Sequence, residues 1–401
     1  MTDAKLPSVG ERIRHLRYQQ MPRMTQRELA ERAGVSVDLI SKLEQGTKQT
    51  ALLVNLHRIA AALDVDVSAL LARPERVEAA VADDGGVVAI RLAITALGDD
   101  AEPASLDELQ RQARYAWAAY WASHFDVLAG LLPDFISIAR ATVREHGTPE
   151  MHATLSDAYG VAGSMLVHLG YIDLAFLAME RAIGAAERSE DELRRAALSG
   201  WMSWLLMHQT GSASQAQRLA IGEADSIEPR VAKATPEHIA VWGGLLLSGA
   251  VAAARDDRLD EADDLLNLAE TAATRLQAAE RAVRIDHERP FGMPVVVQVS
   301  VDANVATGRP ARALEVARRM PPDADLPPAG KARHLADVAA AQTSLGRDRD
   351  ATETLLSIER MAPDWMKYQP FPRTIVRELL ERERRVRTPA LRGLAARLNV
   401  A

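Results

Sequence analysis

Apolar residues recur with helical spacing along most of the chain, and the clearest case is residues 25–46, TQRELAERAGVSVDLISKLEQG. Two groups of apolar residues repeat every three to four positions, one on each side of Gly34: Leu29, Ala30 and Ala33, then Leu39, Ile40 and Leu43. This spacing places apolar side chains on one face of a helix. The segment is therefore predicted to form two short amphipathic helices joined by a turn.

The starts of these two helices carry capping signals. Thr25 followed three residues later by Glu28 predicts a capping box, in which each side chain bonds the backbone amide of the other residue. Ser36 is a good N-cap for the second helix, and Gly34 can adopt the left-handed conformation that ends a helix. Because about three residues separate the helices, we expect them to cross steeply, with the small Ala30 allowing close approach.

Flanking patterns predict three further helices in the first 72 residues. GERIRHLR places Ile13 and Leu16 on one helical face, and a short helix is expected at residues 68–71. Between them, the segment LLVNLHRIAAALDV predicts a helix with apolar positions Leu53, Leu56, Ile59, Ala60 and Leu63. Residues 1–72 are thus predicted to fold as five helices around one small core.

This arrangement resembles the lambda repressor-like helix-turn-helix family over roughly residues 8–71. The resemblance implies that the helix at residues 36–45 lies in the major groove of double-stranded DNA. The positions that it implies to face DNA, the last two as phosphate contacts, are Gln26, Ser36, Val37, Asp38, Ser41, Lys42, Thr47 and Lys48. It also places Arg17 and Glu44 where the family often has an internal ion pair, so these two residues are expected to be structural.

The chemistry of these positions favours DNA, with one exception. Gln26 can bond a phosphate or adenine, Lys42 can reach guanine or a phosphate, and Val37 can touch a thymine methyl group. Asp38 fits less well, because a carboxylate repels phosphate and usefully accepts only from cytosine N4. The alternative is that these residues are only the solvated face of a small bundle. The agreement between caps, turn and flanking helices favours DNA binding.

A second pattern extends through the rest of the chain. Residues 73–106 break the regularity with prolines and glycines, although residues 87–97 could form a helix, and they are interpreted as a linker plus the first element of the next domain. Beyond them, a small residue followed five positions later by alanine recurs between helix-length apolar segments: GYIDLA (170–175), GSASQA (211–216), DRLDEA (257–262), GRPARA (308–313) and GRDRDA (346–351). Such intervals are typical of helical repeats. VVVQVSV, at 295–301, has strand propensity, but the repeat register makes it a helix.

Residues 107–401 resemble a degenerate tetratricopeptide solenoid of five or six helix pairs. The positions that carry the resemblance are Tyr159, Gly163, Gly170, Ala175, Met179 and Ala182, with Gly346, Ala351, Leu355 and Pro363 in a later unit. A solenoid stacks its inner helices into a concave surface that suits a peptide or small ligand. The register places these candidate ligand-binding residues on inner helices: Ser164, Trp201, His208, Gln298 and Asp302. The alternative is that tryptophans such as Trp201 only fill repeat junctions. The expected fold class is all-α, a five-helix head followed by a tetratricopeptide-like α-solenoid.

Composition and charge narrow the function classes. Among 401 residues with a net charge of −7, residues 1–76 carry 12 Lys and Arg against 9 Asp and Glu, so a mildly basic end precedes an acidic body, as suits a DNA-binding head. The absence of cysteine excludes disulfides, thiolate nucleophiles and cysteine-ligated zinc. No phosphate loop, dinucleotide fingerprint or His-Glu-x-x-His pair occurs, so we expect no catalytic residues, no metal and no cofactor.

The sequence also bears on location and source. The first residues lack the apolar stretch of a signal peptide, and no run of 18 or more apolar residues is found, so a cytoplasmic protein without a membrane partner is expected. Arginine outnumbers lysine 42 to 6 in an alanine-rich chain, which is typical of a GC-rich bacterial genome.

The combination of head and body resembles actinobacterial helix-turn-helix regulators with repeat domains and, more distantly, peptide-responsive quorum-sensing regulators of Gram-positive bacteria. The resemblance implies a transcription regulator that binds an operator in double-stranded DNA as a homodimer and whose body senses a peptide or small-molecule effector. The competing hypothesis is a protein-interaction adaptor or antitoxin-like factor, whose body binds another protein while the head only localises it.

Overall fold

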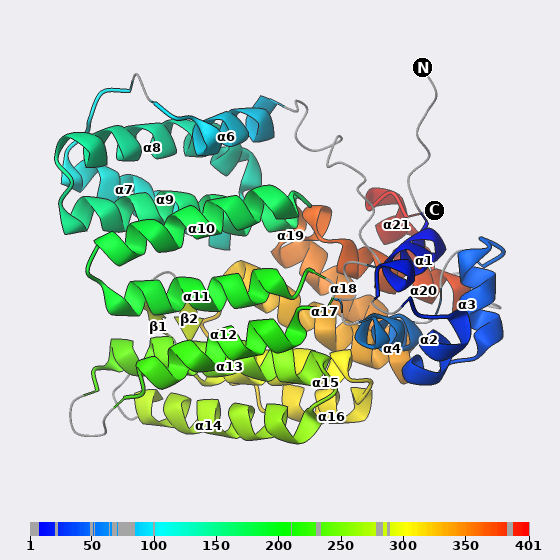
Figure 1. Cartoon of the computed structure of the whole chain (residues 1–401). Helices are drawn as coiled ribbons and strands as arrows, with labels where there is room; N and C mark the ends of the chain where they lie inside the picture. Colours follow the sequence, from blue (N-terminus) through cyan, green and yellow to red (C-terminus); the bar gives the residue numbers. More distant parts are fainter. Residues whose placement is uncertain are drawn as a thin grey trace, which may run out of the picture.

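A computed structural model of the chain describes residues 8–20, 23–48, 51, 53–63, 65, 70, 85–98, 101–209, 211–229, 234–277, 284–286, 289–382 and 388–400. Within these ranges, the regular structure is helical apart from one short hairpin (Figure 1). The predicted all-α class is therefore confirmed for the described part of the chain.

The head contains helices α1 (Val9–Gln19), α2 (Gln26–Ala33), α3 (Val37–Glu44) and α4 (Leu53–Ala62). All four lie where the apolar pattern predicts them. They share one core, whose fully buried members include Ile13, Leu29, Ile40, Leu43, Leu56 and Ile59. α1 and α3 approach closely at Gly10, where a Cβ atom would stand 1.7 Å from the carbonyl oxygen of Leu43. The helix expected at residues 68–71 lies outside the described residues, apart from the buried Leu70.

The body is built from consecutive helices, most of which pack against their neighbours in the chain (Figure 1). Its helices are α6 (Gly85–Thr95), α7 (Leu106–Trp121), α8 (Phe125–Glu145), α9 (Pro149–His168), α10 (Ile172–Arg188), α11 (Glu192–Leu206), α12 (Ala213–Ser226), α13 (Pro236–Arg255), α14 (Leu259–Gln277), α15 (Met293–Ala306), α16 (Pro310–Ala317), α17 (Pro328–Ser344), α18 (Asp348–Met361), α19 (Pro363–Tyr368), α20 (Pro370–Arg382) and α21 (Pro389–Arg397). The helix expected at residues 87–97 is α6, which packs on α8 and α10.

Each of the five recurring segments forms a tight turn between two helices, as predicted. The first residue of every turn has a positive φ, of 58° to 81°: Gly170, Gly211, Asp257, Gly308 and Gly346. The alanine five positions later is fully buried in every case: Ala175, Ala216, Ala262, Ala313 and Ala351. Left-handed backbone reverses the chain direction, and a methyl side chain lets the second helix approach the first closely. The small residue and the alanine therefore act together in each turn.

A sixth turn of this kind, between α7 and α8, escaped the sequence pattern. Ser123 has a φ of 62°, and the position five residues later holds Leu128, which is also fully buried. The turn has the same backbone geometry as the others, but its spacing signal is absent because leucine replaces alanine. The packing of α7 and α8 leaves enough room to bury the Leu128 side chain at this turn.

The short hairpin joins α14 to α15 through strands β1 (Arg284–Asp286) and β2 (Arg289–Phe291), which pair antiparallel. Its last residue, Phe291, is buried against α13, where a Cβ atom on Gly243 would stand 2.0 Å from Phe291 Cζ. The segment VVVQVSV that follows is helical, as the repeat register predicts, and lies within α15. Burial of Val295, Val296 and Val301 outweighs the strand propensity of these residues.

Among the described helices, α13 is long and apolar enough to cross a membrane, but 78% of its most apolar 18-residue window is buried inside the protein. It packs against α11, α12, α14, α15 and both strands of the hairpin. A buried core helix has the same composition, so this helix gives only weak evidence of a membrane span.

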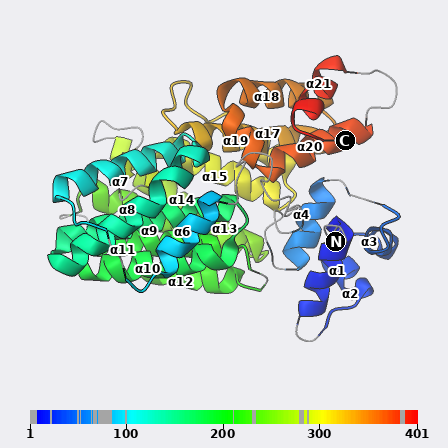
Figure 2. The ribbon, with the colours of Figure 1, turned by 90° about the horizontal axis from the view of Figure 1, so that it is seen from above.

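The head packs directly on the C-terminal part of the body. Helix α4 contacts α15, α17 and α20, and apolar residues of the head and of these helices form one continuous cluster. The ring of His57 on α4 meets the ring of Phe371 on α20 edge to face, with centroids 6.2 Å apart. Figure 2 shows α4 as the head helix nearest the body and α3 at the outer edge.

Candidate nucleic-acid interface

Capping contacts fix the turn between α2 and α3 as the sequence predicts. The amide of Glu28 donates to Thr25 Oγ1 at 3.2 Å, and the amide of Thr25 donates to Glu28 Oε2 at 2.6 Å. The bond from the Thr25 backbone is the main cause that lowers the pKa of Glu28. Gly34 has a φ of 60°, and Ser36 Oγ accepts from the amide of Leu39 at 3.2 Å. Ser36, one of the predicted DNA-facing residues, therefore also caps α3.

A buried ion pair joins α1 to α3, as the resemblance implied. Arg17 Nε and Nη2 donate to the two carboxylate oxygens of Glu44, each at 2.8 Å, and Arg17 Nη1 donates to the carbonyl of Met24 at 2.7 Å. Gln26 Nε2 donates to Glu44 Oε2 at 2.7 Å. Glu44 thus connects the structural pair to a side chain predicted to face DNA. This contact fixes the orientation of the Gln26 amide at the start of α2.

The outer face of α3 is polar and accessible. Val37 is 44% exposed, and the exposed side chains of Asp38 and Lys42 form an ion pair one turn apart, with Nζ and Oδ2 separated by 2.8 Å. Ser41 Oγ accepts from Gln45 Nε2 at 3.0 Å. Exposed pairs of this kind contribute little to stability, so Lys42 can leave Asp38 for a base or phosphate at small cost. The ion pair with Asp38 thus keeps the Lys42 side chain on the outer face of α3, and it is weak enough to break when DNA binds.

Thr47 and Lys48 close the end of α3. Thr47 Oγ1 donates to the carbonyl of Lys42 at 3.1 Å, and the backbone amide of Lys48 donates to the same carbonyl at 3.0 Å. The Thr47 hydroxyl therefore terminates the helix, while the Lys48 side chain extends into solvent. Both expected phosphate contacts are exposed, but the Thr47 hydroxyl already donates to the helix end.

A basic cluster on α1 and just after it was not among the predicted site residues. Three guanidinium groups, those of Arg14, Arg17 and Arg23, lie 4.7 to 5.8 Å from the ring centroid of Tyr18, which is 44% exposed. Hydrogen bonding to Arg17, and then to Arg14, lowers the pKa of Tyr18. The four-residue spacing of Arg14 and Tyr18 on α1 was the available signal, but only the fold brings Arg23 to the same ring. The cluster adds positive charge near the predicted DNA-facing residues.

The predicted ligand-binding residues of the body lie on α9, on and just after α11, and on α15. Trp201 is only 6% exposed and stacks on Trp117, with centroids 6.1 Å apart. Trp204 connects it to His208, with ring distances of 5.8 and 4.9 Å. Ser164 is fully buried, and its Oγ has no hydrogen-bond partner among the residues that the structure describes. Trp201 thus occupies a helix junction, as the alternative interpretation proposed.

Gln298 and Asp302 lie one turn apart on α15 and face α17. Asp302 pairs with Arg333, whose Nε also donates to Asp337 Oδ2 at 3.0 Å. Burial raises the pKa of Asp337 to about 7. Burial lowers the pKa of His168 to about 4, and the charges of His208 and Arg333 act in the same direction. His208 and Asp302 therefore belong to one connected region. This region also contains His168, Arg333 and Asp337, which were not among the predicted ligand-binding residues.

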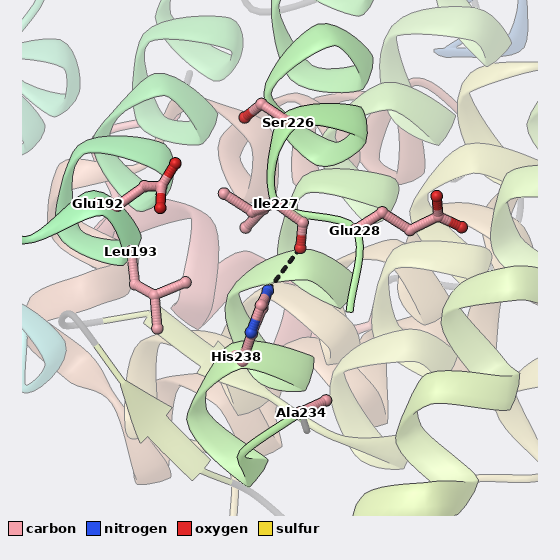
Figure 3. Close-up of a pocket in the computed structure, with 7 residues that line it drawn as sticks. All are labelled: Glu192, Leu193, Ser226, Ile227, Glu228, Ala234 and His238. Carbon is pink, nitrogen blue, oxygen red and sulfur yellow. Dashed lines mark hydrogen bonds between the residues drawn. The ribbon is translucent and has the colours of Figure 1, made fainter. Parts of the chain in front are cut away.

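A small pocket of about 210 Å³ lies elsewhere, between the ends of α11, α12 and α13 (Figure 3). Its lining residues are Glu192, Leu193, Ser226, Ile227, Glu228, Ala234 and His238. His238 Nε2 donates to the carbonyl of Ile227 at 2.5 Å across the pocket. None of the predicted ligand-binding residues lines it.

Comparisons with known proteins support the assignment of the head. The helix-turn-helix family model matches residues 23–70, which span α2, α3 and α4. A search of curated proteins found no match to this chain. The match covers the segment whose caps, turn and exposed helix face are described above. Residues 23–70 are therefore a helix-turn-helix domain of the type that binds DNA, which points to a DNA-binding transcription regulator.

Proposed function

We propose that this protein is a sequence-specific transcription regulator that places α3 in the major groove of its operator. Two features together carry the proposal. The outer face of α3 is polar and exposed, and the amide of Gln26 at the start of α2 is oriented by its hydrogen bond to Glu44. A hydrogen-bonding side chain held in place before binding loses less conformational freedom when it contacts DNA. We assign the chain a regulatory role in the cytoplasm rather than a catalytic one.

We infer that the regulator acts as a homodimer. One recognition helix touches too few base pairs to select a genomic site, and this docking geometry is used by dimers on half-sites about one helical turn apart or a multiple of it. The body, which is much larger than the head, is the proposed source of the dimer contact. Sedimentation of the full chain at micromolar concentration tests this, and a dimer is expected. The inference is contradicted if the protein sediments as a monomer and a single copy binds a two-fold symmetric operator.

We further propose that the body is a tetratricopeptide-like solenoid of the actinobacterial regulator type, with an effector site near His208 and Asp302. The repeated turns, each with left-handed backbone and in five cases a buried alanine, support the first part. The gathering of His168, His208, Arg333 and Asp302 in one region supports the second, because groups with strongly shifted pKa values, such as His168, cluster at functional sites.

The DNA-binding proposal is tested by fluorescence anisotropy with operators selected from genomic DNA. Lys42→Ala and Gln26→Ala are each expected to weaken specific binding by about 1–3 kcal/mol without loss of helix content, since neither is an apolar core residue. Arg27→Ala is the matched control: Arg27 is exposed on α2 but pairs only along its own helix with Glu31, at 3.2 Å. The control is expected to bind normally.

Two results contradict the proposal. Unchanged operator affinity in both Lys42→Ala and Gln26→Ala removes these residues from the interface. Equal affinity of the wild type for random and genomic DNA favours the adaptor hypothesis, because a regulator selects its site over random sequence by roughly 10³ or more. The salt dependence of binding is measured in parallel, since non-specific phosphate contacts weaken steeply as salt increases.

The effector proposal is tested by adding fractionated cell extract to the same binding assay. The wild type is expected to change its operator affinity, whereas Trp201→Leu and Gln298→Leu should keep basal binding and lose the response. A tenfold response needs about 1.4 kcal/mol of difference in effector affinity between two states. If both variants respond like the wild type, these residues only pack the helices.

A further inference from the structure

The C-terminal helices connect two parts of the chain that are far apart in sequence. Helix α17 contacts α7, near the start of the body, and it also contacts α4 of the head. Helix α20 contacts α4 as well. Figure 2 shows α20 next to α4 of the head, with α17 and α19 on the side of α20 that is turned toward the body. Helix α17 also packs on α15 and α16, and α15 contacts α4 as well, so the head is held by the C-terminal end of the body from α15 onward.

The contact with the start of the body centres on His168, at the end of α9. Gln369 Nε2 lies 3.1 Å from His168 Nδ1, and Tyr120 Oη lies 3.2 Å from His168 Nε2. The ring of His168 also stacks on Phe125, with centroids 5.4 Å apart. An amide NH₂ can only donate, so Nδ1 must accept and the imidazole must be neutral. Burial lowers the pKa of His168 to about 4, which keeps the ring in this form at neutral pH.

The contact with the head centres on Phe371, two residues after Gln369. Its ring meets His57 of α4 edge to face, and the Arg333 guanidinium carbon lies 5.2 Å from its centroid. Arg333 is itself bound by Asp302 on α15 and Asp337 on α17. Phe371 therefore touches both the head and the charged group that contains a predicted ligand-binding residue.

We propose that helices α15 to α20 are a latch: it closes on α7 and α9 through α17, Gln369 and His168, and it carries the head through the contacts of α15, α17 and Phe371 with α4. Opening the contact at His168 and reorienting α3 are then one motion. A regulatory role for this motion rests on the proposed function. The motion itself is independent of that proposal. The latch explains how an event among buried residues of the body reaches a DNA-binding helix at the far edge of the head.

The relative strengths of the two contacts decide which one opens. Head and C-terminal helices share a continuous apolar cluster, which includes Leu56, Ile59 and Ile375, all fully buried. On the other side, the body's first helices belong to a separate apolar cluster, and the Gln369 side chain is only half-buried. Contacts that bury little apolar surface open at the lowest free energy. The head is thus expected to stay with α15–α20 while the contact at His168 separates.

Distance measurements between spin labels test the latch without DNA or effector. Because the chain has no cysteine, two introduced cysteines are unique labelling positions. Arg32→Cys on α2 paired with Arg349→Cys on α18 reports the head against the latch, and Arg32→Cys paired with Arg111→Cys on α7 reports the head against the start of the body. All three arginines are exposed. The wild type is expected to give one narrow distance distribution for each pair.

Gln369→Leu should broaden or shift the head-to-α7 distances and leave the head-to-α18 distances narrow. Gln369→Ala is a second variant with the same expectation, and circular dichroism establishes that both are folded. Phe371→Ala should broaden both pairs, since it loosens the head on the latch. Gln342→Leu is the matched control: Gln342 Oε1 accepts from Thr354 within the latch, at 3.0 Å, so neither pair should change.

The latch is refuted if the head-to-α7 distances stay narrow in both Gln369 variants, or if both label pairs broaden equally in them. A broad head-to-α18 distribution in the wild type also refutes it, because the head would then be mobile on its own. These outcomes are independent of DNA binding. A protein that fails to select an operator but shows the expected distances keeps the latch and loses only the proposed function.

Discussion

Replacement of Arg17 by methionine tests how the head holds its DNA-facing side chain. Arg17 and Glu44 are 7% and 3% exposed at the side chain and share two hydrogen bonds of 2.8 Å. Arg17→Met keeps much of the side-chain volume but leaves the Glu44 carboxylate buried with only Gln26 as a partner. Removing one member of a buried ion pair costs about 3–5 kcal/mol. The loss of the bond to the Met24 carbonyl acts in the same direction.

Amide hydrogen exchange of the full chain measures this cost locally, because the head and body need not unfold together. A loss of about 3–5 kcal/mol in opening free energy corresponds to exchange that is roughly 10²- to 4 × 10³-fold faster in α1 and α3. The double variant Arg17→Met, Glu44→Met replaces the whole pair by apolar side chains. Such replacements are often neutral or stabilising, so exchange in the double variant should return close to the wild-type rate.

The exposed pair Arg27 and Glu31 provides the control, with side chains 81% and 65% exposed. Arg27→Met should leave exchange in the head unchanged, because exposed pairs contribute little. The reasoning is wrong if Arg17→Met accelerates exchange less than about tenfold, equivalent to about 1.4 kcal/mol. It is also wrong if the double variant is destabilised by the sum of the two single changes, since additive changes mean that the two side chains have no interaction energy.

Two further predictions concern the body. Burial lowers the pKa of His168 to about 4 from a reference value of 6.5, so between these values the unfolded chain binds a proton that the folded protein does not, and stability falls as pH decreases from about 6.5 to 4. The difference between the two pKa values corresponds to roughly 3 kcal/mol of unfolding free energy. In urea unfolding between pH 6.5 and about 4, the unfolding free energy should fall less steeply with pH for His168→Gln than for the wild type. Equal pH dependence in the two proteins contradicts the assignment. Gly243→Ala places a Cβ atom 2.0 Å from Phe291 Cζ and should cost about 1–3 kcal/mol. Thermal denaturation should show this loss disappearing in a Phe291→Ala background, and an equal loss in both backgrounds rules out the clash.

Local signals in the sequence determined the helix-turn-helix segment almost completely. The capping box at Thr25 and Glu28, the left-handed Gly34 and the cap at Ser36 all depend on residues within one turn of each other, so the chain encodes them without reference to the rest of the fold. The same holds for the five turns of the body. Each needs a residue that tolerates positive φ and a small side chain five positions later, and both requirements are visible in the sequence.

Only the tertiary structure decided which distant surfaces meet. Arg23 joins the arginines around Tyr18, Gln369 reaches His168, and α4 packs on α15, α17 and α20, yet none of these contacts follows from spacing along the chain. The packing of Phe291 against Gly243 is of the same kind, because the sequence does not show which side chain fills the space beside a helical glycine. Helical periodicity fixes the buried face of a helix, whereas the partner of that face depends on how all the helices pack together.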